Sequence, residues 1–290
     1  MPIPPFIRQD GEPLYPKILW NRPISRHGAG GLLVVGGHKS EFSLPTAMYQ
    51  LSMAAGIGRC SVVLPDSLLK VLGGLPGTHF VASTQSGSVG REALGQILAY
   101  VEEADALVLG ASLSANSSTS MLVERLVQES IRPIIAFDDA LISLQHNLRI
   151  LTDNPECLLI VTMPELFKIA GALGIGIQIR PGGGLISKLE IIESIRAVSA
   201  CTYVVYGSEI IISSPTEPIV TPINYRISLI PAAIYGVLSV FWVQNPSNPM
   251  AGLATGSYVL RRLSEKLGAT DRPSTSQLAT FLTEILNEQG

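Results

Sequence analysis

Apolar runs of strand length alternate with amphipathic helical patterns along this chain, and this alternation restricts its fold more than any other feature. GLLVVGG at Gly31–Gly37 and DALVLG at Asp105–Gly110 predict buried strands, and SSTSMLVERLVQES at 117–130 predicts a helix. Further strands are expected at 59–65, 133–138, 157–162, 202–207 and 209–213, and further helices at 43–56, 65–74, 91–104, 163–173 and 185–200. This spacing is typical of βαβ units, so we predict an α/β fold with a central, mostly parallel sheet and helices on both faces.

The chain of 290 residues shows no linker, internal repeat or low-complexity block. We therefore expect one domain over residues 24–290. Residues 1–23 are proline-rich and predict an extended arm that lies on the body or on a neighbouring subunit. The segment RPGGGL (Arg180–Leu185) is interpreted as a loop before a helix and not as a domain boundary.

The composition argues against several classes of function. The formal net charge is −3 and no basic cluster occurs, so nucleic-acid binding is not expected. The three cysteines lie far apart, each in or beside an apolar run, which favours buried reduced thiols in a cytoplasmic protein over a metal site or a disulfide framework. No histidine has a partner at metal-ligand spacing, so no metal is expected.

The run from Ile227 to Val243 is uncharged and close to the length of a membrane span. It contains Pro231, Ser228 and Ser239, and the polar turn QNPSNP follows it directly. A helix that is covered by protein on several sides is as apolar as a span. We therefore interpret the run as a buried core helix and expect no membrane association.

In an open α/β sheet, ligands bind beyond the carboxyl ends of the strands. The candidate ligand residues therefore lie mainly in the turns that follow predicted strands: Gly36, Gly37, His38, Lys39, Gly110, Ser112, Ser114, Asp138, Asn224 and Ser228. The spacing in GGHKS is not that of a phosphate-binding Walker loop, so a plain turn and an anion-binding role both remain open there. Of the pair Asp138-Asp139, one carboxylate is expected to cap the next helix, while binding a metal through water or orienting a hydroxyl are alternatives.

Several of these turns occur in a characteristic order. LLVVGG is followed by a helix that ends in AAGIGRCSVVLP, and then by ADALVLGASLS, PIIAFDDAL, IVTMPELFKIAG, YVVYGSEIIIS and MAGLATGS. In order and spacing they resemble the motifs of the ADP/ATP-dependent NAD(P)H-hydrate dehydratases, of the ribokinase-like superfamily, over roughly residues 24–268. The resemblance implies a ribokinase-like fold, ATP or ADP as cosubstrate, a nucleotide or dinucleotide ligand, and a homo-oligomer.

The chain departs from the family's pattern where that family places its chemistry. The family has Gly-Gly-Ser-Gly-Asp at the start of a long helix, where the glycine N–H groups hold an anion and the Asp is the base. Here Ser228-Leu-Ile-Pro-Ala232 stands at that place, so Ala232 takes the Asp position and Pro231 lacks an N–H. No Asp or Glu occurs between Glu217 and Glu265.

Other motifs are also altered, with Met163 near the family's His and Tyr206 at the Lys of its Lys-Gly pair. The sequence therefore predicts a homologue without dehydratase activity and without catalytic residues. One alternative is an active dehydratase or small-molecule kinase that uses Asp138, Asp139, Asn224 or Lys39. Another is a nucleotide-binding or scaffold module.

Overall fold

The computed structural model describes residues 5–74, 76–114, 116–176, 184–224, 229–268 and 273–288. Within these ranges ten strands form one sheet in the order β1-β10-β9-β8-β7-β6-β5-β2-β3-β4. β9 runs antiparallel to both β8 and β10, and the other described pairs are parallel. The strands are β1 Ile7–Arg8, β2 Gly31–Gly36, β3 Arg59–Pro65, β4 Thr78–Val81, β5 Ala106–Ala111, β6 Ile134–Ala136, β7 Cys157–Thr162, β8 Thr202–Tyr206, β9 Glu209–Ile212 and β10 Ile219–Pro222. The predicted α/β class with a mostly parallel sheet is confirmed.

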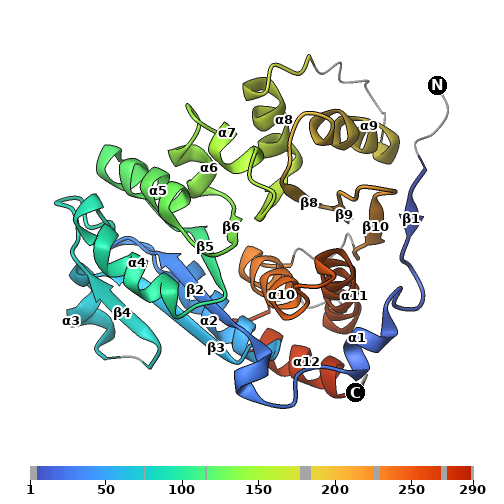
Figure 1. Cartoon of the computed structure of the whole chain (residues 1–290). Helices are drawn as coiled ribbons and strands as arrows, with labels where there is room; N and C mark the ends of the chain where they lie inside the picture. The colour runs from blue at the N-terminus through green and yellow to red at the C-terminus, as the bar shows by residue number, and fades with distance from the viewer. Residues whose placement is uncertain are drawn as a thin grey trace.

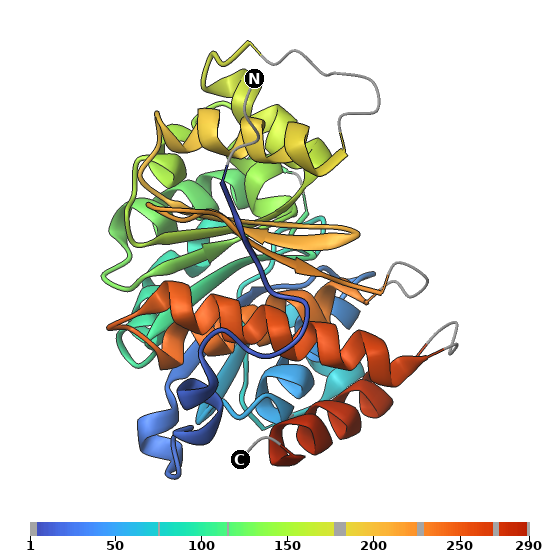
Figure 2. The same ribbon diagram turned by 90° about the vertical axis from the view of Figure 1, so that its right-hand side faces the viewer.

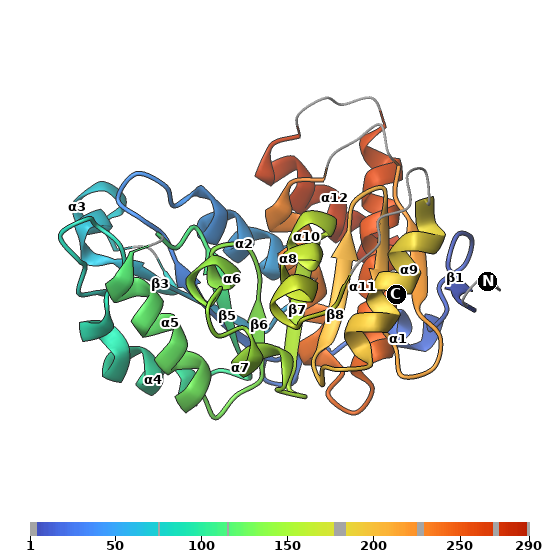
Figure 3. The ribbon, with the colours of Figure 1, turned by 90° about the horizontal axis from the view of Figure 1, so that it is seen from above.

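Helices cover both faces of this sheet (Figure 1). One face carries α1 Pro16–Trp20, α2 Ser43–Ala54, α10 Pro231–Gln244, α11 Pro249–Leu267 and α12 Thr275–Glu288. The other carries α4 Leu94–Glu102, α5 Ser117–Glu129, α6 Asp139–Ser143, α7 Arg149–Thr152, α8 Met163–Ala172 and α9 Gly184–Arg196. Short helical turns complete the chain: α3 Leu69–Leu72, η1 Arg26–Ala29, η2 Asp66–Leu68 and η3 Arg91–Ala93. Figure 3 shows the two layers from above, with the sheet between them.

The uncharged run becomes α10, which lies inside the protein. Its side chains are buried from Ala232 to Trp242 on all sides, because α2 and α11 pack against it and the sheet lies behind it. The interpretation as a core helix is confirmed. In the described ranges, no helix combines the length and the apolar character that crossing a membrane requires.

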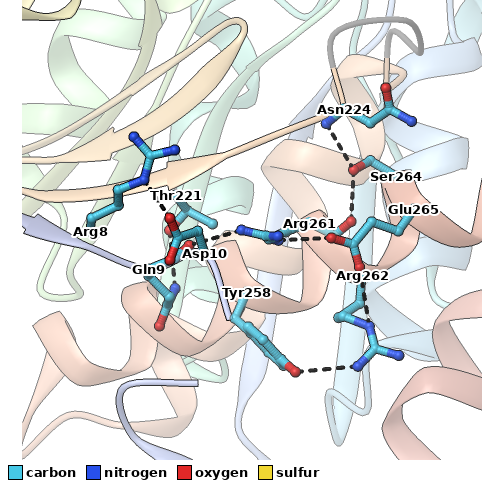
Figure 4. Close-up of polar contacts among 10 residues, drawn as sticks. All are labelled: Arg8, Gln9, Asp10, Thr221, Asn224, Tyr258, Arg261, Arg262, Ser264 and Glu265. Atoms are coloured by element: carbon cyan, nitrogen blue, oxygen red, sulfur yellow. Dashed lines mark hydrogen bonds and ion pairs between the residues drawn. The ribbon is translucent and has the colours of Figure 1, made fainter. Parts of the chain in front are cut away.

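The N-terminal arm lies on the body of the protein and closes one edge of the sheet. β1 pairs with β10 in parallel, and the blue N-terminal segment in Figure 2 passes along this edge before it reaches α11. The Gln9 side chain is 1% exposed and donates hydrogen bonds to Thr221 Oγ1 and Ser257 Oγ and to the carbonyl of Ala254. Figure 4 shows Gln9 and Thr221 beside Arg261 of α11, whose side chain donates a hydrogen bond to the Gln9 carbonyl. The boundary between residues 23 and 24 stays a prediction.

Some elements differ from those expected. β1, β4 and β10 were not predicted, and neither were α6 and α7. The single helix expected at 65–74 is a 3₁₀ turn followed by the four residues of α3. Residues 180–183 of the expected RPGGGL loop lie outside the described residues, and α9 begins at Gly184. Cys60, Cys157 and Cys201 are buried free thiols, as predicted.

Candidate functional site

The glycines at the ends of β2 and β5 allow neighbouring strand ends to approach closely. A Cβ on Gly36 would lie 2.0 Å from the Ala111 carbonyl oxygen, and one on Gly110 would lie 1.9 Å from the Phe137 carbonyl oxygen. Gly110 also has a φ of +124°, which a residue with a side chain rarely adopts. Gly37 follows Gly36 with a φ of +81° and donates its N–H to the Ala111 carbonyl. Backbone packing therefore explains all three glycines without a bound anion.

The turn after β2 is joined to the loop at residues 83–90. The ring of His38 hydrogen-bonds through Nδ1 to Ser40 Oγ (2.7 Å) and through Nε2 to the Ser86 carbonyl (2.8 Å). The Lys39 N–H donates to the Gly87 carbonyl. Both ring nitrogens of His38 thus have partners inside the protein.

The turns after β5 and β6 hold two residues in a backbone conformation that usually requires glycine. Ser112 has a φ of +58° and Asp138 has a φ of +48°. Asp138 occupies the N-cap position of α6, but its side chain makes no capping hydrogen bond. We expected one carboxylate of the Asp138-Asp139 pair to cap this helix, and Asp138 does not do so, because its backbone with a positive φ is not in the extended conformation that capping side chains require.

Two tyrosines and a phenylalanine stand beside Asp138 at the carboxyl ends of β6 and β8. The Tyr235 ring, from α10, stacks on the Phe137 ring with centroids 3.8 Å apart and an angle of 11°. The hydroxyls of Tyr235 and Tyr206 lie 2.8 Å apart. These contacts bridge the first turns of α10 to the sheet.

A third carboxylate, Glu165, lies at the start of α8. Its Oε2 accepts hydrogen bonds from the backbone N–H and the hydroxyl of Thr162, both at 2.7 Å, and so forms a capping box. Burial and then the charge of Glu165 raise the pKa of Asp138. Burial and then the charge of Asp138 raise the pKa of Asp139 to about 7. The three carboxylates therefore form a region of excess negative charge.

A cavity of about 300 Å³ opens between α6 and α8 at this point. Asp138 and Glu165 line it together with Lys168 and Gln145, and apolar side chains of both helices form the rest of the wall. It can accept a small molecule with a polar end and an apolar body. We refer to this cavity and its carboxylates as the β6–β8 cleft.

In the part of the chain that the structure describes, residues 229–234 at the start of α10 offer no polar side chain to this cleft. Its N-cap is Ile230, which has no capping side chain, and Pro231 is its first residue. Ala232 is 3% exposed and packs in the core. Ser228, proposed as a ligand residue, lies outside the described residues.

The remaining predicted ligand residues are spread along the sheet. Ser114 Oγ accepts a hydrogen bond from Asn116 Nδ2 at the start of α5. Asn224 follows β10, which three strands separate from β6, and its N–H donates to Ser264 Oγ on α11 (Figure 4). The structure thus does not bring Asn224 together with Asp138, or His38 together with either.

Four residues of the site were not predicted as ligand residues from the sequence: Glu165, Lys168, Gln145 and Tyr235. Glu165 had a signal, because Thr-x-x-Glu before an apolar run is the sequence pattern of a capping box. Tyr235 had none, since it stands inside a continuous apolar run.

Comparisons with known proteins show similarity in sequence over part of the chain and in structure over nearly all of it. No protein-family model matches the chain. A bifunctional NAD(P)H-hydrate repair enzyme, Nnr, from Methanothermobacter thermautotrophicus is 28% identical over 124 residues, which are 41% of this chain and 24% of that enzyme. The chain therefore spans about a quarter of the length of this curated relative.

Solved structures are similar over nearly the whole chain. A ribokinase-like superfamily protein from Enterococcus faecalis aligns with a TM-score of 0.77 and 14% identity, over 98% of this chain and 96% of that one. An ADP/ATP-dependent NAD(P)H-hydrate dehydratase from Bacillus subtilis, co-crystallized with ATP and Mg²⁺, aligns with a TM-score of 0.65 and 14% identity, over 96% and 99%.

The solved structures show that the fold is ribokinase-like. In sequence, part of the chain is similar to a bifunctional NAD(P)H-hydrate repair enzyme. The resemblance to the ADP/ATP-dependent NAD(P)H-hydrate dehydratase family is confirmed.

Proposed function

We propose that this protein is a homologue of the NAD(P)H-hydrate dehydratases that lacks dehydratase activity and binds a small molecule in the β6–β8 cleft. The observation that carries the proposal is the start of α10. Ile230, Pro231 and Ala232 supply neither a side-chain donor nor a carboxylate there, and Pro231 has no N–H to donate. Removal of the donors and the base of a site costs several orders of magnitude in rate.

The residues present do not fit a nucleotide phosphate at the start of α10. A phosphate at a helix N-terminus needs free N–H groups and little bulk nearby. Here the first N–H is missing, and the side chain of Tyr235 lies in the next turn, bonded to Tyr206. The negative charge of Asp138 and Glu165 also repels an anion. We therefore assign no reaction step to ATP or ADP.

A paired assay tests this proposal. The purified protein is incubated with hydrated NADH and ATP or ADP, with the Bacillus subtilis dehydratase as the positive control. We expect no conversion above the spontaneous rate, and ATP- or ADP-dependent conversion would overturn the proposal. Calorimetric titration of ATP, ADP and NADPH, without detergent, then shows whether a nucleotide still binds.

A second candidate function is an enzyme that uses relocated groups, and one observation favours it. Asp138 lines the cleft beside Glu165 and Lys168 with a raised pKa, as catalytic carboxyls often do. If any dehydratase or kinase activity is found, Asp138→Asn should abolish it, while Glu102→Gln, on the exposed end of α4, should not. Activity that survives Asp138→Asn would exclude this candidate.

We further propose that the protein is a cytoplasmic homo-oligomer. The family resemblance and the apolar composition support this proposal. Light scattering on the purified protein measures its molar mass, and a monomer at micromolar concentration would contradict the proposed oligomer.

A further inference from the structure

A second cavity lies at the amino-terminal ends of the strands, opposite to the β6–β8 cleft, which lies at their carboxyl ends. It has a volume of about 380 Å³ and opens where β5, β6 and β7 begin, beside the last turn of α10. Asp105 precedes β5, Pro133 precedes β6 and Glu156 precedes β7, and all three line it. Because neighbouring strands lie about 4.8 Å apart, the backbones of Asp105 and Glu156 stand roughly 10 Å apart, on either side of Pro133.

The charged residues that line this amino-edge cavity, Asp105 and Glu156, are both acidic. Neither the Asp105 nor the Glu156 carboxylate makes a hydrogen bond or an ion pair with another side chain in the ranges that the structure describes. Arg59 approaches Asp105 near Gly31 without forming an ion pair. The described lining residues include no Lys, Arg or His.

The helix that ends at the cavity adds to this negative potential. The 14 residues of α10 direct the carbonyl end of their dipole toward it, and the last turn carries no basic residue. The C-terminal end of a helix favours a cation.

The walls of the cavity are aromatic and stiff. The indole of Trp242 lines it, and so do four prolines, Pro133, Pro155, Pro246 and Pro249. An indole face attracts an organic cation more strongly than other aromatic rings do. Proline side chains lose little conformational freedom when a ligand covers them.

We propose that the amino-edge cavity binds a small organic cation, whose charged group lies between Asp105 and Glu156 and whose methylene or methyl groups lie against Trp242. This site is independent of the β6–β8 cleft and of the function proposed for it. It would take an alkylammonium or guanidinium compound and would reject its neutral analogue.

Tryptophan fluorescence reports on this site directly. The chain has two tryptophans, and Trp20 is 64% exposed, so Trp20→Phe leaves Trp242 as the single indole. Choline titrated into this variant should change the Trp242 emission saturably. The probe 3,3-dimethyl-1-butanol, which has the same shape and no charge, should not.

Two variants and a control distinguish specific binding in the cavity from a non-specific effect of choline on the protein. Asp105→Asn and Glu156→Gln should each weaken choline binding by about threefold to tenfold, as loss of one partly screened ion pair implies. Glu102→Gln, an exposed carboxyl outside the cavity, should leave the affinity unchanged. Raising the salt concentration should weaken choline binding to the Trp20→Phe protein that has both carboxylates.

The cation could be a free molecule or a basic side chain of another protein, and N-acetyl-arginine amide distinguishes these sources. Tighter binding of this compound than of choline and agmatine points to a side chain, and the reverse order points to a free cation. No saturable change with any cation, an equal response to the neutral analogue, or unchanged affinity in both carboxamide variants would each overturn the proposal.

Discussion

The hydroxyl of Tyr235 lies 2.8 Å from the hydroxyl of Tyr206 and so joins α10 to the end of β8. The ring of Tyr235 is at the same time stacked on Phe137, at the end of β6. A single side chain therefore holds the start of α10 against two strands.

The tyrosine pair should be energetically coupled. Tyr235→Phe and Tyr206→Phe should each lower the free energy of unfolding by about 1 kcal/mol, and the double variant should cost little more than either, because all three lose the same hydrogen bond. Urea unfolding of the four proteins measures this. Tyr49→Phe, whose hydroxyl has no described partner, is the control, and strictly additive effects would contradict the coupling.

A carboxylate at the start of α10 should not restore the family's chemistry. Ala232→Asp buries a carboxyl at a position that is 3% exposed, without the N–H donors of a glycine-rich turn. We expect no dehydratase activity and a loss of about 2 kcal/mol of stability at pH 8. The loss should shrink at pH 4, where the new carboxyl is protonated. Ala232→Asn is the uncharged control, and an active Ala232→Asp protein would show that the helix start is still competent.

Protonation of Asp139 should make stability fall as the pH rises from about 4 to about 7. Burial and Asp138 raise the pKa of Asp139 to about 7 from an ordinary value of 3.8, so across this range the folded protein keeps a proton that the unfolded chain has lost. Asp139→Asn should reduce the loss of unfolding free energy between pH 4 and pH 7 by about 1 kcal/mol. The effect is this small because solvent screens a half-buried carboxyl. Chemical unfolding at several pH values tests this, with the exposed Glu103→Gln as control; an unchanged slope would contradict it.

The arm should loosen when Gln9 is replaced. Gln9→Leu removes three hydrogen bonds to β10 and α11 and leaves buried hydroxyls with fewer partners, so we expect a loss of about 2–3 kcal/mol. Trypsin should then cleave after Arg8 and Lys17 faster than in the parent protein. Glu12→Gln, exposed on the same arm, should change neither quantity. Equal cleavage rates in all three proteins would show that Gln9 does not hold the arm.

The three thiols should be unreactive in the folded protein. Burial raises the pKa of Cys60 and of Cys201 to about 12, and it also raises the pKa of Cys157 well above its ordinary value. A thiol reagent at pH 8 should therefore modify almost none of them within minutes, and all three after denaturation. Rapid modification of a native thiol would show that the surrounding core opens locally.

The strands that could be predicted from the sequence are those with a distinctive local residue pattern. β2, β5 and β7 are short continuous apolar runs, which strands buried on both faces require. β1 and β10 have two and four residues, and their strand conformation comes from pairing with distant segments, so no local pattern shows it. The features of the candidate site also divide into those that a local sequence pattern predicts and those that depend on packing. Asp138 was predicted from its place after a strand, but it does not make the helix cap that we expected from one carboxylate of the Asp138-Asp139 pair, because its φ of +48° depends on how β6 meets α6.

The pairing of β1 with β10 has a consequence for how the chain folds. Gln9 and Thr221, which anchor this pair, are 212 residues apart in sequence. During synthesis the arm must therefore wait without its partner until most of the protein has left the ribosome, and this edge of the sheet is among the last parts to assemble. A nascent chain stalled before residue 219 would therefore have a protease-sensitive arm, because β10 and the helices α10, α11 and α12 would still be missing.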